Sequence, residues 1–343
     1  MTSTLSSAPT SDTAALPTPR GPLSAAVIGA LASTPDQGST ALAAPDGSAD
    51  AAVADADPYG DDLHLALYVC YELHYRSFTG VDDAWEWNPD LLRLRGRMEA
   101  IFLDHLRAHV PTGGSVNDEM DALATEHVDG SGPSYHLRDH GTAEQMREYL
   151  AHRSLYHLKE ADPHAWAIPR LQGQAKAAYV AVEFDEFGGG RGSRMHQVLF
   201  RDLLDAAGLD SSYLGYLDHV GAPTLAPVNL MSFFGLHRRW RGAAAGHLAA
   251  TEITSSPGSS RLVTALRRLG FAEQCVAFYA EHVEADAVHE QVMRHDVVGD
   301  LVASDPALEA DVVFGMRALG YVEDVLAAHL MEAWAAARPS ITL

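Results

Sequence analysis

The segment Phe278–His289 constrains the fold of this chain most, because it places polar side chains where a helix should be apolar. An α-helix turns about 100° per residue, so His282, Asp286 and His289 fall within about 60° of one another on one face. Cys275 and other apolar residues share that face, which is therefore the side that packs against a core. Burying three such polar groups without partners is costly. The segment predicts that further polar groups meet it inside the protein.

The charge of the chain argues against two classes of partner. The 343 residues include 46 acidic and 24 basic side chains, for a formal net charge of −22. Nucleic-acid-binding proteins carry a basic surface, and anionic membranes attract one. We therefore expect no nucleic-acid partner and no association with a membrane.

Three further features predict a cytoplasmic protein. No apolar run approaches the roughly 20 residues that a membrane-spanning helix needs. The N-terminus lacks the charged and apolar regions of a secretory signal. The two cysteines, Cys70 and Cys275, lie in apolar helical patterns and are typical of buried free thiols in a reducing compartment.

The chain divides into two parts by composition. Residues 1–57 are rich in Ala, Ser, Thr, Pro, Gly and Asp and almost free of aromatic side chains, so we expect a disordered tail. Residues 58–343 show repeated helical periodicity, and no strand pattern competes with it. We expect an all-α domain of about seven to nine helices.

Other acids and histidines lie on apolar helix faces and are candidate partners for the opening segment. Glu186 and Glu252 align with apolar or small residues on their helices, and His196 follows Glu186 after a Gly-rich break. Glu160 lies on a mixed face and is the weaker candidate. Glu183 aligns with polar residues and is expected to point towards solvent.

The number of candidate ligands favours two metal ions. Three histidines and four carboxylates exceed what one six-coordinate ion can bind, and nitrogen and oxygen ligands without thiolate suit iron or manganese. No inward pair of Glu-x-x-His motifs is present, which argues against a ferritin-like scaffold. Six other histidines are interpreted as a solvated histidine-rich region rather than a second metal site: His127, His136, His140, His152, His157 and His164.

These residues match the pattern of a known family. Glu186, then His196 across a Gly-rich turn, then Glu252 and the motif His282-x-x-x-Asp286-x-x-His289 resemble the haem-oxygenase-like di-iron oxidases and oxygenases, also called iron-containing redox enzymes. The resemblance covers residues from about 58 to the C-terminus. It implies a haem-oxygenase-like helical bundle and two non-haem iron ions that react with dioxygen. The positions that match the family's iron ligands are Glu160, Glu186, His196, Glu252, His282, Asp286 and His289.

The resemblance implies an oxidoreductase that uses dioxygen on a small molecule. Related enzymes act on amines, amino acids and fatty acids, so we expect a small amine, amino acid or carboxylic acid. The reaction would be N-oxygenation or oxidative C–H or C–C cleavage, in natural-product metabolism. A homodimer and an external electron donor, whose identity the sequence does not indicate, are part of this expectation.

Three alternatives keep the same scaffold. A non-catalytic metal-binding or regulatory protein would use the same ligands without turnover. A haem oxygenase would need a histidine near the start of the domain, for which His64 and His74 are candidates. A thiaminase-like hydrolase would need a reactive cysteine, and Cys275 is the candidate on the apolar face.

Overall fold

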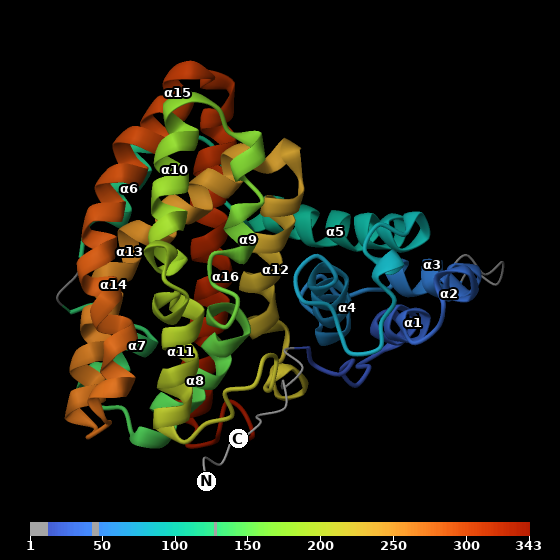
Figure 1. The fold of residues 1–343 in the computed structure, drawn as a ribbon, viewed down its shortest axis with the longest axis horizontal. Helices are drawn as coiled ribbons and strands as arrows, with labels where there is room; N and C mark the ends of the chain where they lie inside the picture. The colour runs from blue at the N-terminus through green and yellow to red at the C-terminus, as the bar shows by residue number, and fades with distance from the viewer. Residues whose placement is uncertain (1–12, 43–47, 127–128) are drawn as a thin grey trace, which may run out of the picture.

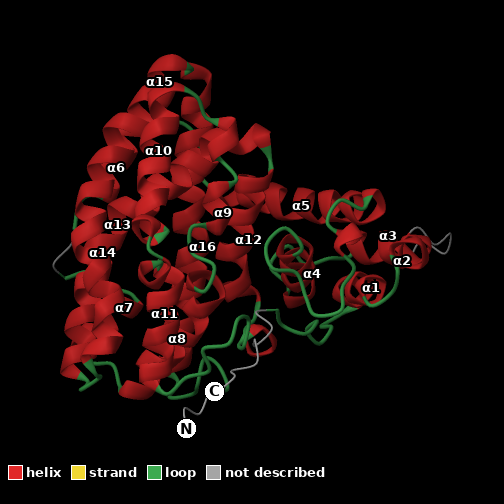
Figure 2. Cartoon of the chain, in the orientation of Figure 1, coloured by secondary structure: helices red, strands yellow, loops and turns green. Residues whose placement is uncertain are grey.

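The described part of the chain is all-helical, as expected. The computed structural model describes residues 13–42, 48–126 and 129–343, and within these ranges the only β-structure is an isolated bridge between Ala14 and Phe78. Figure 2 shows helices throughout the described residues. They hold more helices than the seven to nine expected, because the connections contain short ones such as α6 (Val116–Leu123), α7 (Pro133–Asp139) and α9 (Asp162–Ala165).

Long helices form the taller body of the molecule, and the N-terminal helices project to one side of it (Figure 1). Two large clusters of buried apolar side chains hold the helices together; the first runs through both the N-terminal helices and the tall body, and the second lies within the tall body. Its main helices are α8 (Ala143–His157), α10 (Gly173–Glu186), α11 (His196–Ala207), α12 (Ala222–Leu236), α13 (Arg241–Arg268), α14 (Glu273–Gln291) and α16 (Glu309–Ala335).

Helices α13 and α16 approach closely because glycines face the partner backbone. A Cβ atom at Gly246 would lie 2.0 Å from the Val312 carbonyl oxygen, and one at Gly315 would lie 2.1 Å from the Ala243 carbonyl oxygen. Any larger side chain at either position would force the helices apart. This close contact positions α13, which carries Glu252, within the centre of the bundle.

The chain stays helical beyond the C-terminal end of α14 at Gln291. It continues into a π-helical segment, η7 (Val292–Gly299), and then α15 (Asp300–Ser304). Such π-helical turns are rare and occur frequently at functional sites. Met293, Val297 and Val298 of η7 are buried, so the segment is anchored in the core next to α10.

The expected disorder of residues 1–57 is wrong for the part that the structure describes. This part forms α1 (Pro22–Leu31), α2 (Pro35–Leu42) and α3 (Ser48–Ala54), which lie beside α4 (Asp61–Glu72) and α5 (Pro89–His109). Residues 1–12 and 43–47 lie outside the described residues, and their expected disorder is untested.

A local apolar face explains why these helices fold. Leu23, Val27 and Leu31 recur at helical spacing on α1 and are buried, although the average composition of the tail is polar and Ala-rich. Asp62 completes the contact by accepting hydrogen bonds from the backbone amides of Leu23 and Ser24, at 2.9 and 2.8 Å. A carboxylate at a helix N-terminus satisfies free amides and interacts favourably with the helix dipole.

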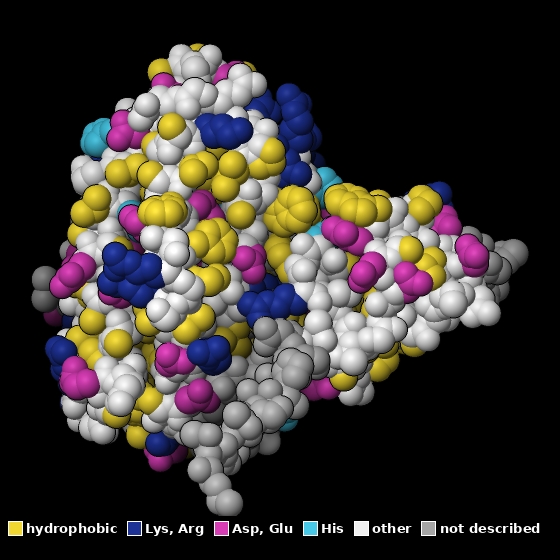
Figure 3. All heavy atoms as spheres, viewed as in Figure 1, with side chains coloured by type: hydrophobic (Ala, Val, Ile, Leu, Met, Phe, Trp, Pro, Cys, Tyr) yellow, Lys and Arg dark blue, Asp and Glu magenta, His cyan; other side chains and the backbone are white. Residues whose placement is uncertain are grey.

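The surface is mixed in character on the face drawn in Figure 3. Lys and Arg side chains of the described residues lie there as separate groups among acidic and hydrophobic ones, rather than as a continuous basic area. The expected absence of a nucleic-acid partner stays a prediction. Among the described helices, none has the length and apolar character needed to cross a membrane.

Candidate metal centre

The first two candidate ligands lie at the C-terminal ends of their helices. Glu160 follows α8 in a tight turn, where Gln197 donates a hydrogen bond to its backbone carbonyl at 2.9 Å. Glu186 is the last residue of α10. Both carboxylates are buried. The chain therefore brings two acidic groups into the bundle at points where the helix stops and the side chain can turn inward.

A glycine turn then redirects the chain to the next ligand. Gly188, Gly189 and Gly190 have φ values of 75°, 60° and 78°, which side chains with a Cβ rarely adopt. A Cβ at Gly188 would also lie 2.6 Å from the backbone of Arg194. The turn ends where α11 begins at His196, a buried residue. The Gly-rich segment thus links two candidate ligands.

The remaining four candidates come from α13 and α14, two long helices that pack along each other. Glu252 lies on α13, and His282, Asp286 and His289 lie on α14. All four are buried, with exposed fractions between 1% and 6%. The single face predicted for the three α14 residues is therefore a buried face.

The seven predicted residues meet as two groups of four that share one member. In each group the potential donor atoms lie within 4.8 Å of one another. Glu186 belongs to both. The first group is Glu160, Glu186, His196 and His282, and the second is Glu186, Glu252, Asp286 and His289. The structure confirms that the residues lie together, whereas their binding of metal stays a prediction.

Distances between donor atoms show how tightly the groups are gathered. His196 Nδ1 lies 2.6 Å from Glu186 Oε2, and His282 Nε2 lies 3.7 Å from Glu160 Oε1. In the second group, His289 Nδ1 lies 3.2 Å from Glu252 Oε2 and 3.6 Å from both Glu186 Oε1 and Asp286 Oδ1.

Several of these buried atoms have no hydrogen-bond partner, and this fits a metal site. They include both oxygens of Asp286, one oxygen each of Glu160 and Glu186, and Nε2 of His282. Buried polar atoms are normally hydrogen-bonded, and unsatisfied ones in a native protein call for an explanation such as a bound ion. Four carboxylates would balance the charge of two divalent cations, and this donor set suits iron.

Burial and crowding set the protonation of these side chains. Burial raises the pKa of Glu252 to about 8. Burial alone would lower the pKa values of the histidines, but Glu160 raises that of His282 to about 10, and Asp286 with Glu252 raises that of His289 to about 11. Histidine binds a metal ion as neutral imidazole, so metal binding must release protons and its affinity rises with pH.

Two of the histidines are oriented by contacts of the ring nitrogen that does not face the other candidate ligands. His282 Nδ1 lies 2.8 Å from the carbonyl oxygen of Phe278, which accepts its hydrogen and leaves Nε2 facing the other donors. His289 Nε2 lies 3.2 Å from Asp185 Oδ2, which leaves Nδ1 facing Glu252. Such contacts fix the tautomer of metal-binding histidines.

Sequence reasoning missed Asp185 and His157. Asp185 precedes Glu186 on α10, and adjacent helical residues point in different directions, so no pattern connected it with the site. His157 Nδ1 lies 3.0 Å from Glu160 Oε1. The spacing of three residues between His157 and Glu160 was the available signal, but the cluster of nearby histidines obscured it.

The interpretation of a solvated histidine-rich region is wrong for several of its members. His152 and His164 are buried with exposed fractions of 2% and 3%, and His157 is half-buried. His164 Nε2 lies 3.1 Å from Nδ1 of the buried His247. These histidines lie on α8 and α9, whose inner sides face the core. His140 is exposed as expected, and His127 lies outside the described residues.

The expected outward orientation of Glu183 is also wrong. Its exposed fraction is 2%, and neither carboxylate oxygen has a hydrogen-bond partner. Burial raises its pKa well above the ordinary value, and the nearby Glu186 and Glu252 raise it further. The prediction assumed one buried face on α10, whereas η7 and α15 also pack against this helix.

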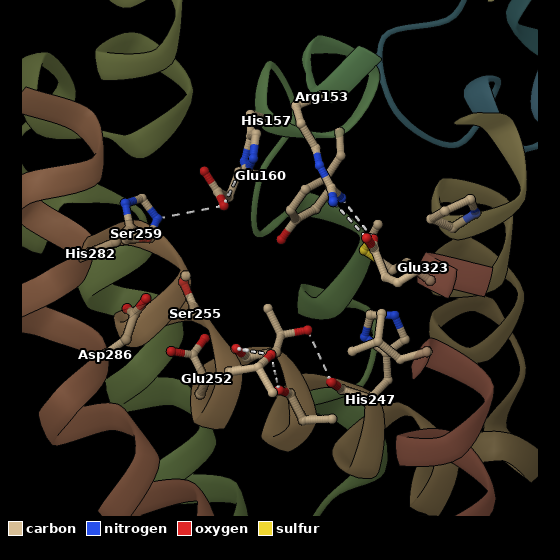
Figure 4. Close-up of a pocket in the computed structure, with 18 of the residues that line it drawn as sticks. Arg153, His157, Glu160, His247, Glu252, Ser255, Ser259, His282, Asp286 and Glu323 are labelled. Atoms are coloured by element: carbon tan, nitrogen blue, oxygen red, sulfur yellow. Dashed lines mark hydrogen bonds and ion pairs between the residues drawn. The ribbon is translucent and has the colours of Figure 1, made fainter. Parts of the chain in front are cut away.

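A cavity of about 400 Å³ adjoins the two groups. Its volume lies in the range of small-molecule sites. Its walls come from α8, α12, α13, α14 and α16 and include both apolar and charged side chains. Figure 4 shows Glu160, Glu252, His282 and Asp286 on one side of this space, with Arg153 and Glu323 on the other.

The residues proposed for the two catalytic alternatives are engaged elsewhere. His64 contacts the Pro58 carbonyl and Asn229 through its two ring nitrogens, and His74 contacts Glu86 and Arg95 in the same way. Neither imidazole has a free nitrogen for haem iron. Cys275 is fully buried and burial raises its pKa, which makes the thiol a poor nucleophile.

Comparisons with known proteins agree with this geometry. The family model described as iron-containing redox enzyme matches residues 147–323, which include all seven residues of the two groups. Nitrosourea synthase from Streptomyces achromogenes subsp. streptozoticus is 24% identical over 161 residues. The match covers 47% of this chain and 34% of that protein, so the chain spans about a third of the relative's length.

A solved structure supports the fold. The crystal structure of a CADD-like protein of unknown function from Nostoc punctiforme superposes with a TM-score of 0.50 and 17% sequence identity, covering 67% of this chain and 96% of that one. Because the matching family model covers more than half of the chain, the chain belongs to the family of iron-containing redox enzymes.

Proposed function

We propose that the protein is a non-haem di-iron oxidoreductase that uses dioxygen to oxidise a small molecule. The observation that carries the proposal is the pair of buried four-residue groups that share Glu186 and leave donor atoms without partners. Glu160, His196 and His282 would hold one ion, Glu252, Asp286 and His289 would hold the other, and Glu186 could serve either group. Membership in a family of iron-containing redox enzymes supports iron as the metal.

Bound iron would supply the electrons and open coordination positions that activate dioxygen. The residues of this chain would hold the ions, keep their own orientation and limit access of water. His282 and His289 would be held in the required tautomers by the Phe278 carbonyl and Asp185. The apolar walls of the adjoining cavity would place the substrate beside the open side of the cluster.

The substrate class proposed is a small amine, amino acid or carboxylic acid, in natural-product metabolism. The likeness to nitrosourea synthase, a protein named for a nitrogen-oxidised product, supports N-oxygenation as the first reaction to test. In that reaction one oxygen atom of dioxygen would enter an N–H bond and the other would become water, with two protons from solvent and two electrons from the two ferrous ions, which an external reductant would reduce again before the next turnover. Oxidative C–H or C–C cleavage is the other reaction that a di-iron centre here would support.

The test is to load the full chain with Fe²⁺ without oxygen, measure iron per chain, and then add dioxygen with candidate amines, amino acids and fatty acids. The proposal expects about two iron ions per chain and an oxidised product found by mass spectrometry. His282→Ala should retain only about one iron ion per chain and form no product, whereas His140→Ala, a change at an exposed histidine, should retain the iron and the activity of the unchanged protein. Wild-type protein that binds no iron, or binds iron but never consumes dioxygen, would contradict the proposal.

A further inference from the structure

We propose that Arg153, Glu323 and the hydroxyl of Tyr279 bind the zwitterionic head group of an α-amino acid in the cavity that adjoins the candidate metal ligands. This proposal rests on the proposed function, because it assigns the substrate class of the same cavity. It adds a binding site for the α-carboxylate and α-ammonium groups, and it determines which end of the substrate faces the cluster.

The first observation is a two-point ion pair across the cavity. Arg153 on α8 donates through both terminal nitrogens to Glu323 on α16, at 2.7 and 2.6 Å. Both side chains line the cavity, and each is partly accessible, with exposed fractions of 23% and 31%. Figure 4 shows the pair on the opposite side of the drawn space from His282 and Asp286.

The second observation is a set of unused hydrogen-bond donors beside that pair. The Nε atom of Arg153 is buried and has no partner, although its two terminal nitrogens are satisfied by Glu323. The hydroxyl of Tyr279 is also buried and unpartnered, and the whole residue has an exposed fraction of 4%. Both residues line the cavity. Unsatisfied buried donors cost free energy, and a ligand that accepts from them would recover it.

The chemistry of these donors fits a carboxylate. Burial raises the pKa of Tyr279 well above its ordinary value, so the hydroxyl keeps its proton and donates. A carboxylate could accept from Tyr279 Oη and Arg153 Nε, since a charged acceptor forms the stronger hydrogen bonds. The guanidinium offers donors only and is itself positively charged, which makes a cation a poor ligand beside Arg153 Nε.

The charge of Glu323 then requires a cation in the same ligand. Arg153 is already neutralised by Glu323, so a simple carboxylic acid would add an uncompensated negative charge to a partly desolvated site. A zwitterion adds no net charge, because its ammonium group would pair with Glu323 while its carboxylate faces Arg153. Asp324, which also lines the cavity, further favours a ligand that carries an ammonium group.

The position of the site has a consequence for the reaction. Tyr279 precedes His282 by three residues on α14, so the head-group site lies about one turn from the first candidate ligand on that helix. Arg153 and Glu323 lie further across the cavity (Figure 4). A head group held there directs the side chain of the amino acid towards Glu160, His282 and Asp286. Oxidation is therefore expected on the side chain rather than at the α-carbon.

The test measures binding to the full chain loaded with Fe²⁺ in the absence of dioxygen, so that no turnover occurs. The ligands are the proteinogenic L-amino acids and norleucine, followed by the matching amine and the matching carboxylic acid of the tightest binder. We expect that amino acid to bind at least about tenfold more tightly than either partial analogue, since each analogue lacks one charged contact.

Three variants separate the contacts. Tyr279→Phe removes a hydroxyl that no protein group uses, so folding is preserved. This variant should bind the amino acid and the carboxylic acid about fivefold more weakly or worse. Its affinity for the amine should not change. Arg153→Gln should act on the same two ligands by about tenfold or more, and Glu323→Gln on the amino acid and the amine. Arg317→Gln breaks a comparable pair with Glu119 outside the cavity and is the matched control.

Metal content is measured first for each protein. If wild-type protein binds no iron, the proposed function fails. If iron is present but no amino acid binds, the head-group site is overturned while the di-iron centre stands. The same conclusion follows if amines or fatty acids bind as tightly as the best amino acid and Tyr279→Phe changes no affinity.

Discussion

The two donor groups that share Glu186 differ in how their histidines are held. In the first group, the hydrogen of His282 Nδ1 goes to a backbone carbonyl on the same helix, that of Phe278. In the second, His289 is oriented by Asp185, a side chain on α10 that is 60% exposed. The first group is thus fixed by helix geometry inside the core, whereas the second depends on a contact between two helices near the surface.

The two groups also differ in the kinds of donor atom that they offer. The first combines two imidazoles with two carboxylates, and the rings of His196 and His282 lie close to Phe278 in the core. The second combines one imidazole with three carboxylates. The first group therefore offers more imidazole nitrogen, and the second more carboxylate oxygen. Because the second group's histidine is oriented by the exposed Asp185, we expect the second ion to exchange more readily.

The largest effect should follow the loss of the shared ligand. Glu186→Ala removes a donor from both groups and should reduce bound iron from about two ions per chain to well below one. Anaerobic iron analysis measures this. Glu284→Ala, at an exposed position on α14, is the control and should retain both ions. A Glu186→Ala protein with two tightly bound irons would show that the groups do not share this residue.

Removal of one histidine should affect one group at a time. His282→Ala and His289→Ala should each leave about one ion per chain, because the other group keeps its full set of donors. Substitution with Co²⁺ should give different visible spectra for the two variants, since the remaining sites differ in their number of imidazole ligands. If both variants kept two irons and wild-type turnover, the assignment of these residues as ligands would be wrong.

Metal removal should loosen α14 more than the rest of the bundle. Without cations, the carboxylates of Glu160, Glu186, Glu252 and Asp286 repel one another, and metal binding couples to the order of the helices that carry them. Amide hydrogen exchange of residues 282–289 should be at least about tenfold faster in metal-free than in iron-loaded protein. Residues of α5, far along the chain from the site, serve as the internal reference. Equal protection of α14 in both forms would count against the coupling.

The smallest effect should come from the residue that only orients a ligand. Asp185→Ala removes the acceptor of His289 Nε2. It should weaken the binding of one of the two ions by about tenfold to a hundredfold and leave the affinity for the other unchanged. A titration with Fe²⁺ followed by a chelator resolves the two ions. Asp205→Ala, an exposed acid on α11, is the control. Equal weakening of both ions would remove the proposed difference between the groups.

Helical periodicity was sufficient to predict the all-α class and the inward face of α14, because both depend on local spacing. It also helped to select the seven candidate donor residues, since acids and histidines on apolar helix faces are rare. The sharing of Glu186 could not be predicted, because it depends on where the C-terminal end of α10 lies relative to α13 and α14. Asp185 was missed for the same reason.

The wrong predictions have two related causes: composition was averaged over a long segment, and each helix was assumed to have only one buried face. The average polarity of residues 1–57 concealed the apolar stripe of α1, in which Leu23 and Val27 are buried against the N-terminal core. Glu183 was placed on a solvated face, although α10 is covered on more than one side. Sequence periodicity describes one helix at a time, and these positions are decided by its neighbours.

The most direct test of the central claim is anomalous X-ray scattering at the iron edge from crystals loaded with Fe²⁺ without oxygen. The account predicts two peaks about 4 Å apart, one on each side of the Glu186 carboxylate. The first peak should lie among Glu160, His196 and His282, and the second among Glu252, Asp286 and His289. A single peak, or iron bound outside these residues, would contradict it.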